Sequence, residues 1–372
     1  MKKVVVLSVI LSLSVCAIAA DTDWEPARSW VFIVGLLEWK HPKFLHSFPK
    51  AGRRDTILAA KFKELGVPED HVVLMQDAGA TTDAVNAAFK KFAERPGKGD
   101  TLFVYFCGHG YKGEDGVDYF ATYDAWDTAW AVSSIFDTIE AHFHGAHAVL
   151  LADCCNSGAM ANLARTRTTA IDYACLTSVA AGDTSTNCWT FSDSLLDVLE
   201  GKPQADLDGG GVVTFGEAAH FIDDEMRFFD EQTAASSHLG KVQNNFRLAV
   251  VKQPKSDKRI GERVEVLYEG EWWRALIEDV KDGKVKVYYA SAAMREEGWV
   301  AEKDIREFKA KPAKALAAGM KVNVEWQKRW WPAKVEKLDE AHENGAKYFI
   351  SYDGYGREWD EWVTDKRIRA RP

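Results

Sequence analysis

The sequence predicts an α/β domain with a mostly parallel central sheet, followed by two small all-β barrels. Two observations in the 372-residue chain indicate this arrangement. Between residues 28 and 252, apolar runs of strand length alternate with runs of helical spacing, which is typical of a parallel sheet covered by helices on both faces. Beyond a polar linker at residues 252–258, short alternating strands recur in two copies, at residues 259–308 and 318–371.

In the first domain, the buried apolar runs predict strands and the amphipathic runs predict helices. Gly66 ends the first expected helix, and Pro96 with Gly97 ends the second, because neither residue type continues a helix well. The expected strands cover residues 30–37, 72–75, 101–105, 146–151, 173–179 and 246–251, and the expected helices cover residues 54–65, 83–94, 133–143, 192–199 and 215–228.

The two predicted barrels are internal repeats. Residues 271–275 (EWWRA) match residues 329–333 (RWWPA), and the second copy carries a longer loop near residues 339–345. Charges nearly cancel in both copies, so neither has the basic surface that nucleic-acid binding requires. We therefore expect both to bind a protein or a cell-surface ligand.

Composition and charge describe an ordinary soluble protein. Hydrophobic residues make up 47% of the chain and charged residues 28%, and the formal net charge is -9. This acidic balance argues against a general nucleic-acid coat protein, and it favours basic peptides as substrates.

The start of the chain has the pattern of a secretory signal peptide. Lys2 and Lys3 precede an apolar run at residues 4–15, and the small residues Ala17 and Ala19 suit cleavage after residue 19 or 20. The apolar run is too short to span a bilayer. We expect residues 1–19 to be removed and the protein to be exported. Lipidation at Cys16 is the alternative, although the bulky Val15 is unusual before a modified cysteine.

Removal of a signal peptide would leave an odd number of cysteines. At least one thiol would then be unpaired, which suits a nucleophile better than a set of structural disulfides. The five remaining cysteines are Cys107, Cys154, Cys155, Cys175 and Cys188.

Two short strings follow predicted buried strands and carry the chemistry. The first is Cys107-Gly108-His109-Gly110, and the second, at residues 153–158, reads DCCNSG. Since the carboxyl ends of parallel strands meet in one crevice, a histidine and a cysteine there indicate a thiol–imidazole pair. His109 can take the thiol proton, and the backbone N–H of Gly110 can help to stabilise an oxyanion.

With these strings, residues 28–252 resemble the caspase and metacaspase group of cysteine peptidases. Residues 119–124 (YFATYD) also resemble the segment that follows the histidine of that family. The resemblance implies a three-layer caspase-like fold, with His109 as general base and Cys155, third in its string, as nucleophile. It implies that the Gly110 and Cys155 amides stabilise the oxyanion, and that Cys154 is a buried neighbour.

The same resemblance implies a preference for basic residues before the cut. Metacaspases place carboxylates in that pocket, and here Asp153 lies two residues before Cys155 while Asp55 occupies the position of the other pocket acid. We predict cleavage after Arg or Lys, although Arg53 and Arg54 could neutralise Asp55. Basic specificity would make Arg165 and Arg167, expected in the loop after Cys155, candidates for self-cleavage.

A glycine-rich stretch at residues 206–217 partly follows the pattern of an EF-hand calcium loop. Asp206, Asp208 and Glu217 supply oxygens at positions 1, 3 and 12, but Gly210 removes the ligand at position 5. We expect weak calcium binding at most, and no cofactor is required for the predicted chemistry. A plain turn leading into the next helix is an equal alternative.

The barrels, especially the second, resemble Tudor, Tudor-knot and chromo-barrel modules, which have SH3-like folds. Members of that group hold methylated lysine or arginine in aromatic cages through cation–π attraction. The resemblance implies a cage in the second copy, whereas the first lacks the corresponding elements. The candidate cage residues are Trp326, Tyr352, Tyr355 and Trp359.

Together these features predict an exported cysteine endopeptidase with two C-terminal binding modules. The alternative from another functional class is an inactive caspase-like scaffold that acts by binding through its aromatic repeats.

Overall fold

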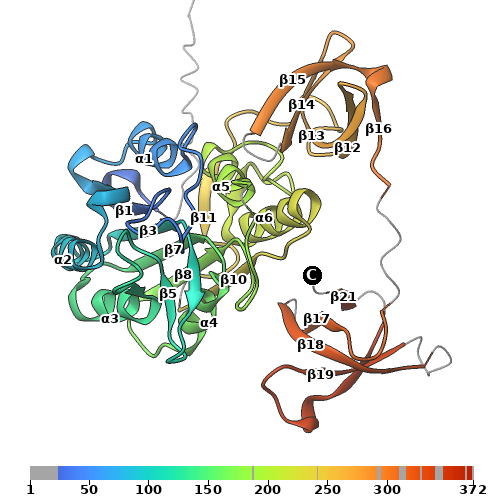
Figure 1. Cartoon of the computed structure of the whole chain (residues 1–372). Coiled ribbons are helices and arrows are strands. Elements are labelled where there is room, and N and C mark those ends of the chain that lie inside the picture. Colours follow the sequence, from blue (N-terminus) through green and yellow to red (C-terminus); the bar gives the residue numbers. More distant parts are fainter. Residues whose placement is uncertain are drawn as a thin grey trace, which may run out of the picture.

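The computed structural model describes residues 24–370 except residues 187, 241, 291–294, 310–315, 327–328, 340–346 and 365–366. Figure 1 shows an α/β domain, coloured blue to yellow, and two small β modules in orange and red. The predicted signal peptide lies outside the described residues. Within the described part of the chain, no helix combines the length and apolar character needed to cross a membrane.

The central sheet has six strands in the order β10-β8-β7-β3-β1-β2. Five run parallel, and β10 pairs antiparallel with β8 at one edge. β1 and β3 are buried along their whole length, as continuous apolar runs in a doubly covered sheet predict. The strands are β1 (Ser29–Gly35), β2 (Val72–Gln76), β3 (Thr101–Cys107), β7 (His147–Asp153), β8 (Asp172–Thr177) and β10 (Ala235–Leu239).

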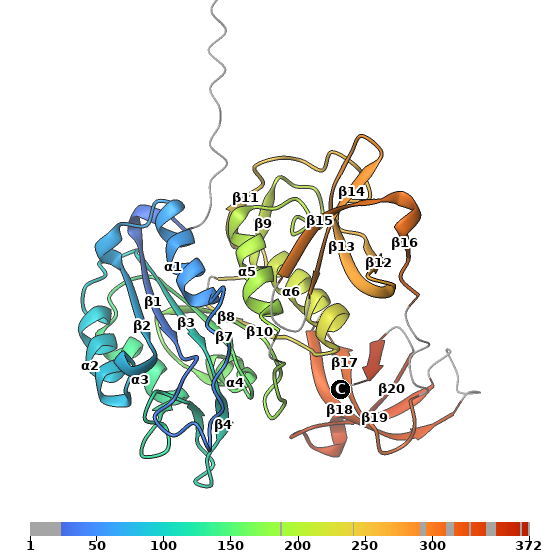
Figure 2. The ribbon, with the colours of Figure 1, turned by 45° about the horizontal axis from the view of Figure 1, so that its top comes forward.

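Helices cover both faces of this sheet, which gives the predicted three layers (Figure 2). Alternate residues of β1 point to opposite faces: Val31 and Ile33 pack with the helices on one side, and Phe32 packs with those on the other. The first side carries α1 (Arg54–Glu64), α5 (Thr190–Glu200) and α6 (Phe215–Asp230), and the second carries α2 (Thr82–Ala93), α3 (Val132–His142) and α4 (Gly158–Thr166).

Several elements were not expected from the sequence. α4 follows the cysteine string directly, and β10 supplies the antiparallel edge. The expected last strand, β11 (Arg247–Val250), pairs with β9 (Val212–Thr214) outside the central sheet. A further small sheet joins β4 (Gly110–Lys112), β5 (Asp118–Phe120) and β6 (Trp130–Ala131), and single 3-10 turns occupy Pro26–Arg28, Glu69–His71, Asp77–Gly79, Glu302–Asp304 and Arg357–Trp359.

The repeats form two five-stranded antiparallel sheets with equivalent strand orders, which confirms the two predicted all-β modules. In each, the second strand carries an irregularity in its pairing, at Ile277/Asp279 and at Val335/Lys337. The first module contains β12 (Arg263–Tyr268), β13 (Glu271–Lys281), β14 (Lys284–Ala290), β15 (Arg295–Ala301) and β16 (Ile305–Glu307), and the second contains β17 (Lys321–Trp326), β18 (Arg329–Leu338), β19 (Tyr348–Tyr352), β20 (Glu361–Val363) and β21 (Ile368–Ala370).

Candidate active site

The register of the sheet brings the two chemical strings to one edge. Gly35, Cys107 and Asp153 are direct neighbours at the carboxyl ends of β1, β3 and β7. His109 and Cys155 each follow two residues after the last residue of adjacent strands. The structure therefore places both groups at the edge where open α/β sheets bind their ligands.

The close approach of the two strings depends on Gly110. A side-chain carbon at this position would lie 2.2 Å from the Cys155 carbonyl oxygen and 2.8 Å from the Cys154 sulfur. The residue after His109 therefore packs directly against the backbone of Cys155, and only glycine fits there. The oxyanion role of the Gly110 and Cys155 amides remains a prediction.

The turn after Cys155 is fixed by Asn156, which adopts a left-handed conformation with φ 56°. Its backbone N–H donates to the Asp183 oxygen at 2.8 Å, its side-chain oxygen accepts from the Gly182 N–H at 2.7 Å, and its amide nitrogen donates to Asp118 at 2.9 Å. These bonds hold the sharp bend that presents Cys155 at the end of β7.

The two adjacent cysteines have different environments. Cys154 is 1% exposed in the apolar core, and burial raises the pKa of its thiol well above the usual range. Cys155 is partly exposed, and its Sγ accepts a hydrogen bond from the Ser185 N–H at 3.2 Å. All five cysteines in the described residues are free thiols. Of the two adjacent cysteines, Cys155 is the one whose thiol is accessible.

His109 is oriented by a residue that sequence reasoning missed. Its Nε2 lies 2.9 Å from the backbone oxygen of His46, and the rings of Trp39, His46 and Phe48 surround it at 4.5–4.7 Å. When Nε2 donates to this carbonyl, Nδ1 keeps its lone pair and can accept a proton. Burial lowers the pKa of His109, which favours the neutral, basic form. His46 has no sequence signal, because its backbone makes the contact.

Asp55 is buried beside Gly35 and is already paired with a cation. Arg53 Nη2 lies 2.7 Å from its carboxylate, and the Gln76 amide donates at 2.9 Å. Arg53 also pairs with Asp77 at 2.6 Å, while Arg54 turns away to Asp193. The neutralisation considered from the sequence therefore involves Arg53, and the pocket role of Asp55 remains a prediction.

Asp153 is buried at the end of β7 and accepts a hydrogen bond from the Ser192 hydroxyl at 2.6 Å. Burial and the charge of nearby Asp230 raise its pKa to about 7. Burial and the carboxylates of Asp55 and Asp153 also raise the pKa of the Cys107 thiol, so the two predicted acids lie near the same buried group.

Asp230, the last residue of α6, is a second acid beside Asp153. Burial raises its pKa to about 6, and side-chain hydrogen bonds from Thr190 and Thr186 partly oppose this rise. No motif marks Asp230, since only tertiary packing brings the end of α6 to this edge of the sheet.

The prediction that Arg165 lies in a loop is wrong, because this residue lies inside α4. The buried Met160, Ala161 and Ala164 give this segment a helical apolar face that was not recognised. Arg167 pairs with Asp137 and Glu140 and stacks on Phe136. Cleavage after either arginine would first require this region to open, and self-cleavage remains a prediction.

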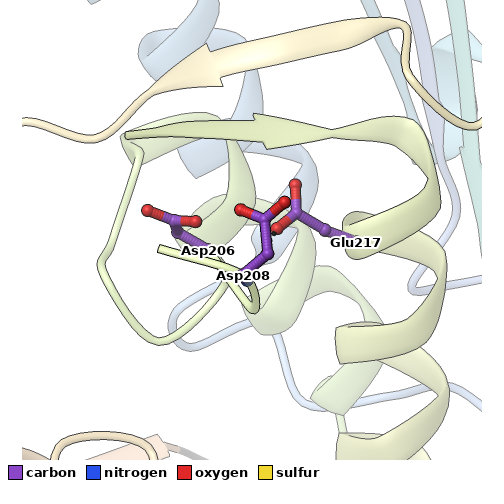
Figure 3. Close-up of side chains that lie close together, drawn as sticks. All are labelled: Asp206, Asp208 and Glu217. Carbon is purple, nitrogen blue, oxygen red and sulfur yellow. Dashed lines mark hydrogen bonds between the residues drawn. The ribbon is translucent and has the colours of Figure 1, made fainter. Parts of the chain in front are cut away.

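The acidic loop brings its three predicted ligands together (Figure 3): carboxylate oxygens of Asp206, Asp208 and Glu217 lie within 4.8 Å of one another. The same carboxylates accept backbone N–H groups, those of Leu207, Asp208 and Thr214 at Glu217 and those of Gly210 and Gly211 at Asp206. Glu217 also completes a capping box with Thr214 at the start of α6. These bonds are those of a turn and a helix cap, and they are enough to explain why the three carboxylates lie together. Calcium binding remains a prediction.

In the second module, aromatic rings gather where the cage was predicted. Trp326 and Trp359 have ring centres 5.8 Å apart, and Tyr355 lies 6.1 Å from Trp359 and 6.3 Å from Tyr352. Trp331, which sequence reasoning missed, contacts both Trp326 and Tyr355. Trp326, Tyr355 and Trp359 are 37–50% exposed, so ring faces remain available to a ligand.

Sequence comparisons agree with this architecture. A family model described as the caspase domain matches residues 55–256. An Agenet domain model matches residues 261–308, and a Tudor-knot model, described as the RNA binding activity-knot of a chromodomain, matches residues 316–370. No curated protein matches the chain.

The solved structures that match this chain share little sequence with it. A Geobacter sulfurreducens protein is 16% identical, with a TM-score of 0.43, 61% of this chain covered and 97% of the other. Caspase-1 from Spodoptera frugiperda is 13% identical, with a TM-score of 0.41, 64% of this chain covered and 93% of the other. A structure named Tbtudor is 17% identical, with a TM-score of 0.15 and coverages of 15% and 97%.

The family match spans the sheet strands and helices that carry the His109 and Cys155 strings, and it covers more than half of the sequence. The chain therefore belongs to the caspase-domain family and carries Agenet and Tudor-knot modules at its carboxyl end.

Proposed function

We propose that this protein is an exported cysteine endopeptidase that cleaves peptide bonds after Arg or Lys. The observation that carries the proposal is the presentation of a partly exposed thiol, Cys155, and an oriented, neutral imidazole, His109, at the ends of adjacent strands. Export rests on the signal-peptide pattern of residues 1–19.

His109 accepts the Cys155 proton, and the thiolate attacks the scissile carbonyl carbon to form a C–S bond. The negative charge on the carbonyl oxygen is stabilised by the Gly110 and Cys155 amides. The C–N bond then breaks, and His109 returns the proton to the leaving amine. Water, deprotonated by His109, hydrolyses the thioester and regenerates the free thiol.

Recognition of the basic side chain is assigned to the buried acidic residues near the carboxyl end of β7. The charge of Asp55 is compensated by Arg53, whereas Asp153 feels the negative charge of Asp230, and neither makes an ion pair among the described residues. A guanidinium or ammonium group bound there would pair with both carboxylates. In this arrangement, Asp153 and Asp230 dominate selectivity and Asp55 contributes less.

An arginyl or lysyl peptide chloromethyl ketone is expected to alkylate Cys155, with loss of chloride and formation of a thioether. Labelling should be about 10²-fold faster than with the matched aspartyl reagent, because the like charge of the latter is repelled by Asp153 and Asp230. Mass spectrometry of the labelled peptides measures both rates. Cys155→Ala serves as the unlabelled control.

A folded protein whose Cys155 does not react with any of these reagents would support the scaffold alternative. Preferential labelling by the aspartyl reagent would instead contradict the basic specificity while leaving the peptidase assignment intact.

We propose a second, separable function for the second module: its aromatic cluster binds a methylated lysine or arginine of a protein partner. Five rings surround one region, and three of them are substantially exposed. A methylated cation gains cation–π attraction from such faces and loses little hydration when it enters.

The cage predicts that the full-length Cys155→Ala protein, which cannot cut the probe, binds a trimethyllysine peptide more tightly than the unmodified peptide. Tyr355→Ala should weaken this binding about tenfold, as expected for the loss of one cage ring. Calorimetry measures both affinities. Trp299→Ala, which removes an exposed ring of the first module, is the matched control. Equal affinity for both peptides, or preferential binding of an RNA oligonucleotide, would contradict the cage.

A further inference from the structure

We propose that the first β module and the turn after α6 position the Ser185 amide against the Cys155 sulfur, so that this module is part of the machinery that keeps the thiol reactive. The inference rests on the proposed role of Cys155 as the nucleophile. It assigns positioning roles to Gln232 and Arg274, neither of which touches the reacting atoms.

The first link is the contact at the sulfur. Ser185 N–H points at Cys155 Sγ over 3.2 Å. A backbone donor aimed at sulfur stabilises the thiolate, which is the reactive form of cysteine. Ser185 lies in the irregular stretch between β8 and α5, so helix or strand pairing does not fix its position.

The second link is Gln232, whose side chain holds the backbone on both sides of Ser185. Its Nε2 donates to the Thr184 oxygen at 2.6 Å, and its Oε1 accepts from the Thr186 N–H at 3.3 Å. One amide side chain thus supplies both the donor and the acceptor that this stretch of backbone needs. Because the two bonds bracket Ser185, they restrict the direction of the Ser185 N–H.

The third link is the contact between the first module and the end of α6 (Figure 2). Arg274 of β13 donates to the Phe228 oxygen and pairs with Glu231 at 2.7 Å, one residue before Gln232. Phe308 packs edge-on against Phe228 with ring centres 4.8 Å apart.

This contact is anchored further along the helix. Arg263 of β12 pairs with the fully buried Glu225 at 2.9 Å, and the Tyr288 hydroxyl also donates to Glu225. A buried carboxylate that meets donors from another module is costly to expose, so the module is held firmly on α6. The positioning of Cys155 therefore extends through Gln232 and Glu231 to a domain outside the peptidase fold.

The test compares alkylation of individual cysteines by iodoacetamide in the full-length protein at pH 7.5, followed by peptide mass spectrometry. In Gln232→Ala, Cys155 should react about tenfold more slowly, the effect of losing one hydrogen bond to a charged group. Cys188, in the same stretch of chain, should react faster because the stretch loosens. The buried Cys175 should stay protected, which shows that the protein remains folded.

Gln232→Glu keeps the shape but removes the donor to Thr184, and it should behave like Gln232→Ala. Arg274→Ala should slow the alkylation of Cys155 and accelerate that of Cys188, each by a smaller factor than the Gln232 variants do. Arg306→Ala is its matched control, because Arg306 pairs with Glu265 within the module. In a peptide-hydrolysis assay, the Gln232 variants should lower kcat with KM nearly unchanged.

A Cys155 rate that is unchanged or faster in both Gln232 variants would overturn the inference. An effect of Gln232 without any effect of Arg274 would overturn the part assigned to the module. The expected alkylation pattern in a protein that hydrolyses no peptide would leave the positioning intact and contradict the peptidase proposal, so the two failures are distinguishable.

Discussion

Cys155→Ala is expected to lower kcat for an arginyl peptide by about 10⁴-fold or more, with a small change in KM. The variant lacks the sulfur that forms the acyl intermediate but keeps the pocket that binds the substrate side chain. His109→Ala should cause a loss of similar size, and the double variant little more, because the two groups act as one unit. Steady-state kinetics with a fluorogenic peptide measures these losses.

Cys154→Ala is the matched control for this prediction. It removes the adjacent thiol, but that sulfur is buried in the core and cannot reach a substrate. We expect it to retain activity and to lower the free energy of unfolding by about 1 kcal/mol, the cost of a small cavity. If Cys154→Ala abolished activity in a folded protein while Cys155→Ala did not, the assignment of the nucleophile would be wrong.

The sequence was sufficient to predict the parts of this protein that depend on local pattern. The strands that end at Gly35, Cys107 and Asp153 are continuous apolar runs, and this local pattern is enough to predict them. The parallel order of such strands implies that residues just beyond them converge, so the sequence pointed to His109 and the adjacent cysteines, and the family resemblance selected Cys155 among them. The repeat of paired tryptophans similarly indicated two β modules.

Features that depend on tertiary contacts could not be predicted in this way. The residue beside Asp55 indicated possible neutralisation, but only the structure shows that Arg53, and not Arg54, makes the ion pair. Asp230 influences Asp153 because of where α6 ends in the folded chain, and its sequence neighbours carry no motif. The backbone oxygen of His46 has no residue-specific signal at all.

Asp153→Asn should lower kcat/KM for an arginyl substrate by about 10²-fold or more, because it removes one carboxylate of a largely desolvated ion pair with the substrate. Asp230→Asn should have a smaller effect of the same sign. Cleavage of an uncharged substrate should change little in either variant. Asp83→Asn, at an exposed position of α2, controls for the loss of one surface charge. Undiminished preference for arginine in Asp153→Asn would contradict the assigned pocket.

The same substitution should make the protein more stable at high pH. The pKa of Asp153 is about 7 in the folded protein and near 3.8 in the unfolded chain, so folding favours the protonated form. This contribution to stability is fully present below about pH 4 and is lost as pH rises through about 7. Asparagine mimics the protonated acid, and its advantage over the wild type should therefore grow across this window and reach about 4 kcal/mol at pH 8.

Urea unfolding of both proteins at pH 4 and pH 8 measures this difference, and a difference that did not grow with pH would contradict it.

The same ionisation should govern function in the wild type. Burial lowers the pKa of His109 and favours its neutral form, so we assign the rise of kcat/KM for an arginyl substrate through about pH 7 to Asp153. In Asp230→Asn, the rise should move to lower pH, because the negative charge of Asp230 is one reason why Asp153 holds its proton. Ionisation of Asp153, which is unfavourable in the empty site, thus becomes favourable when a basic side chain binds beside it. The site is therefore selective for substrates that carry such a side chain.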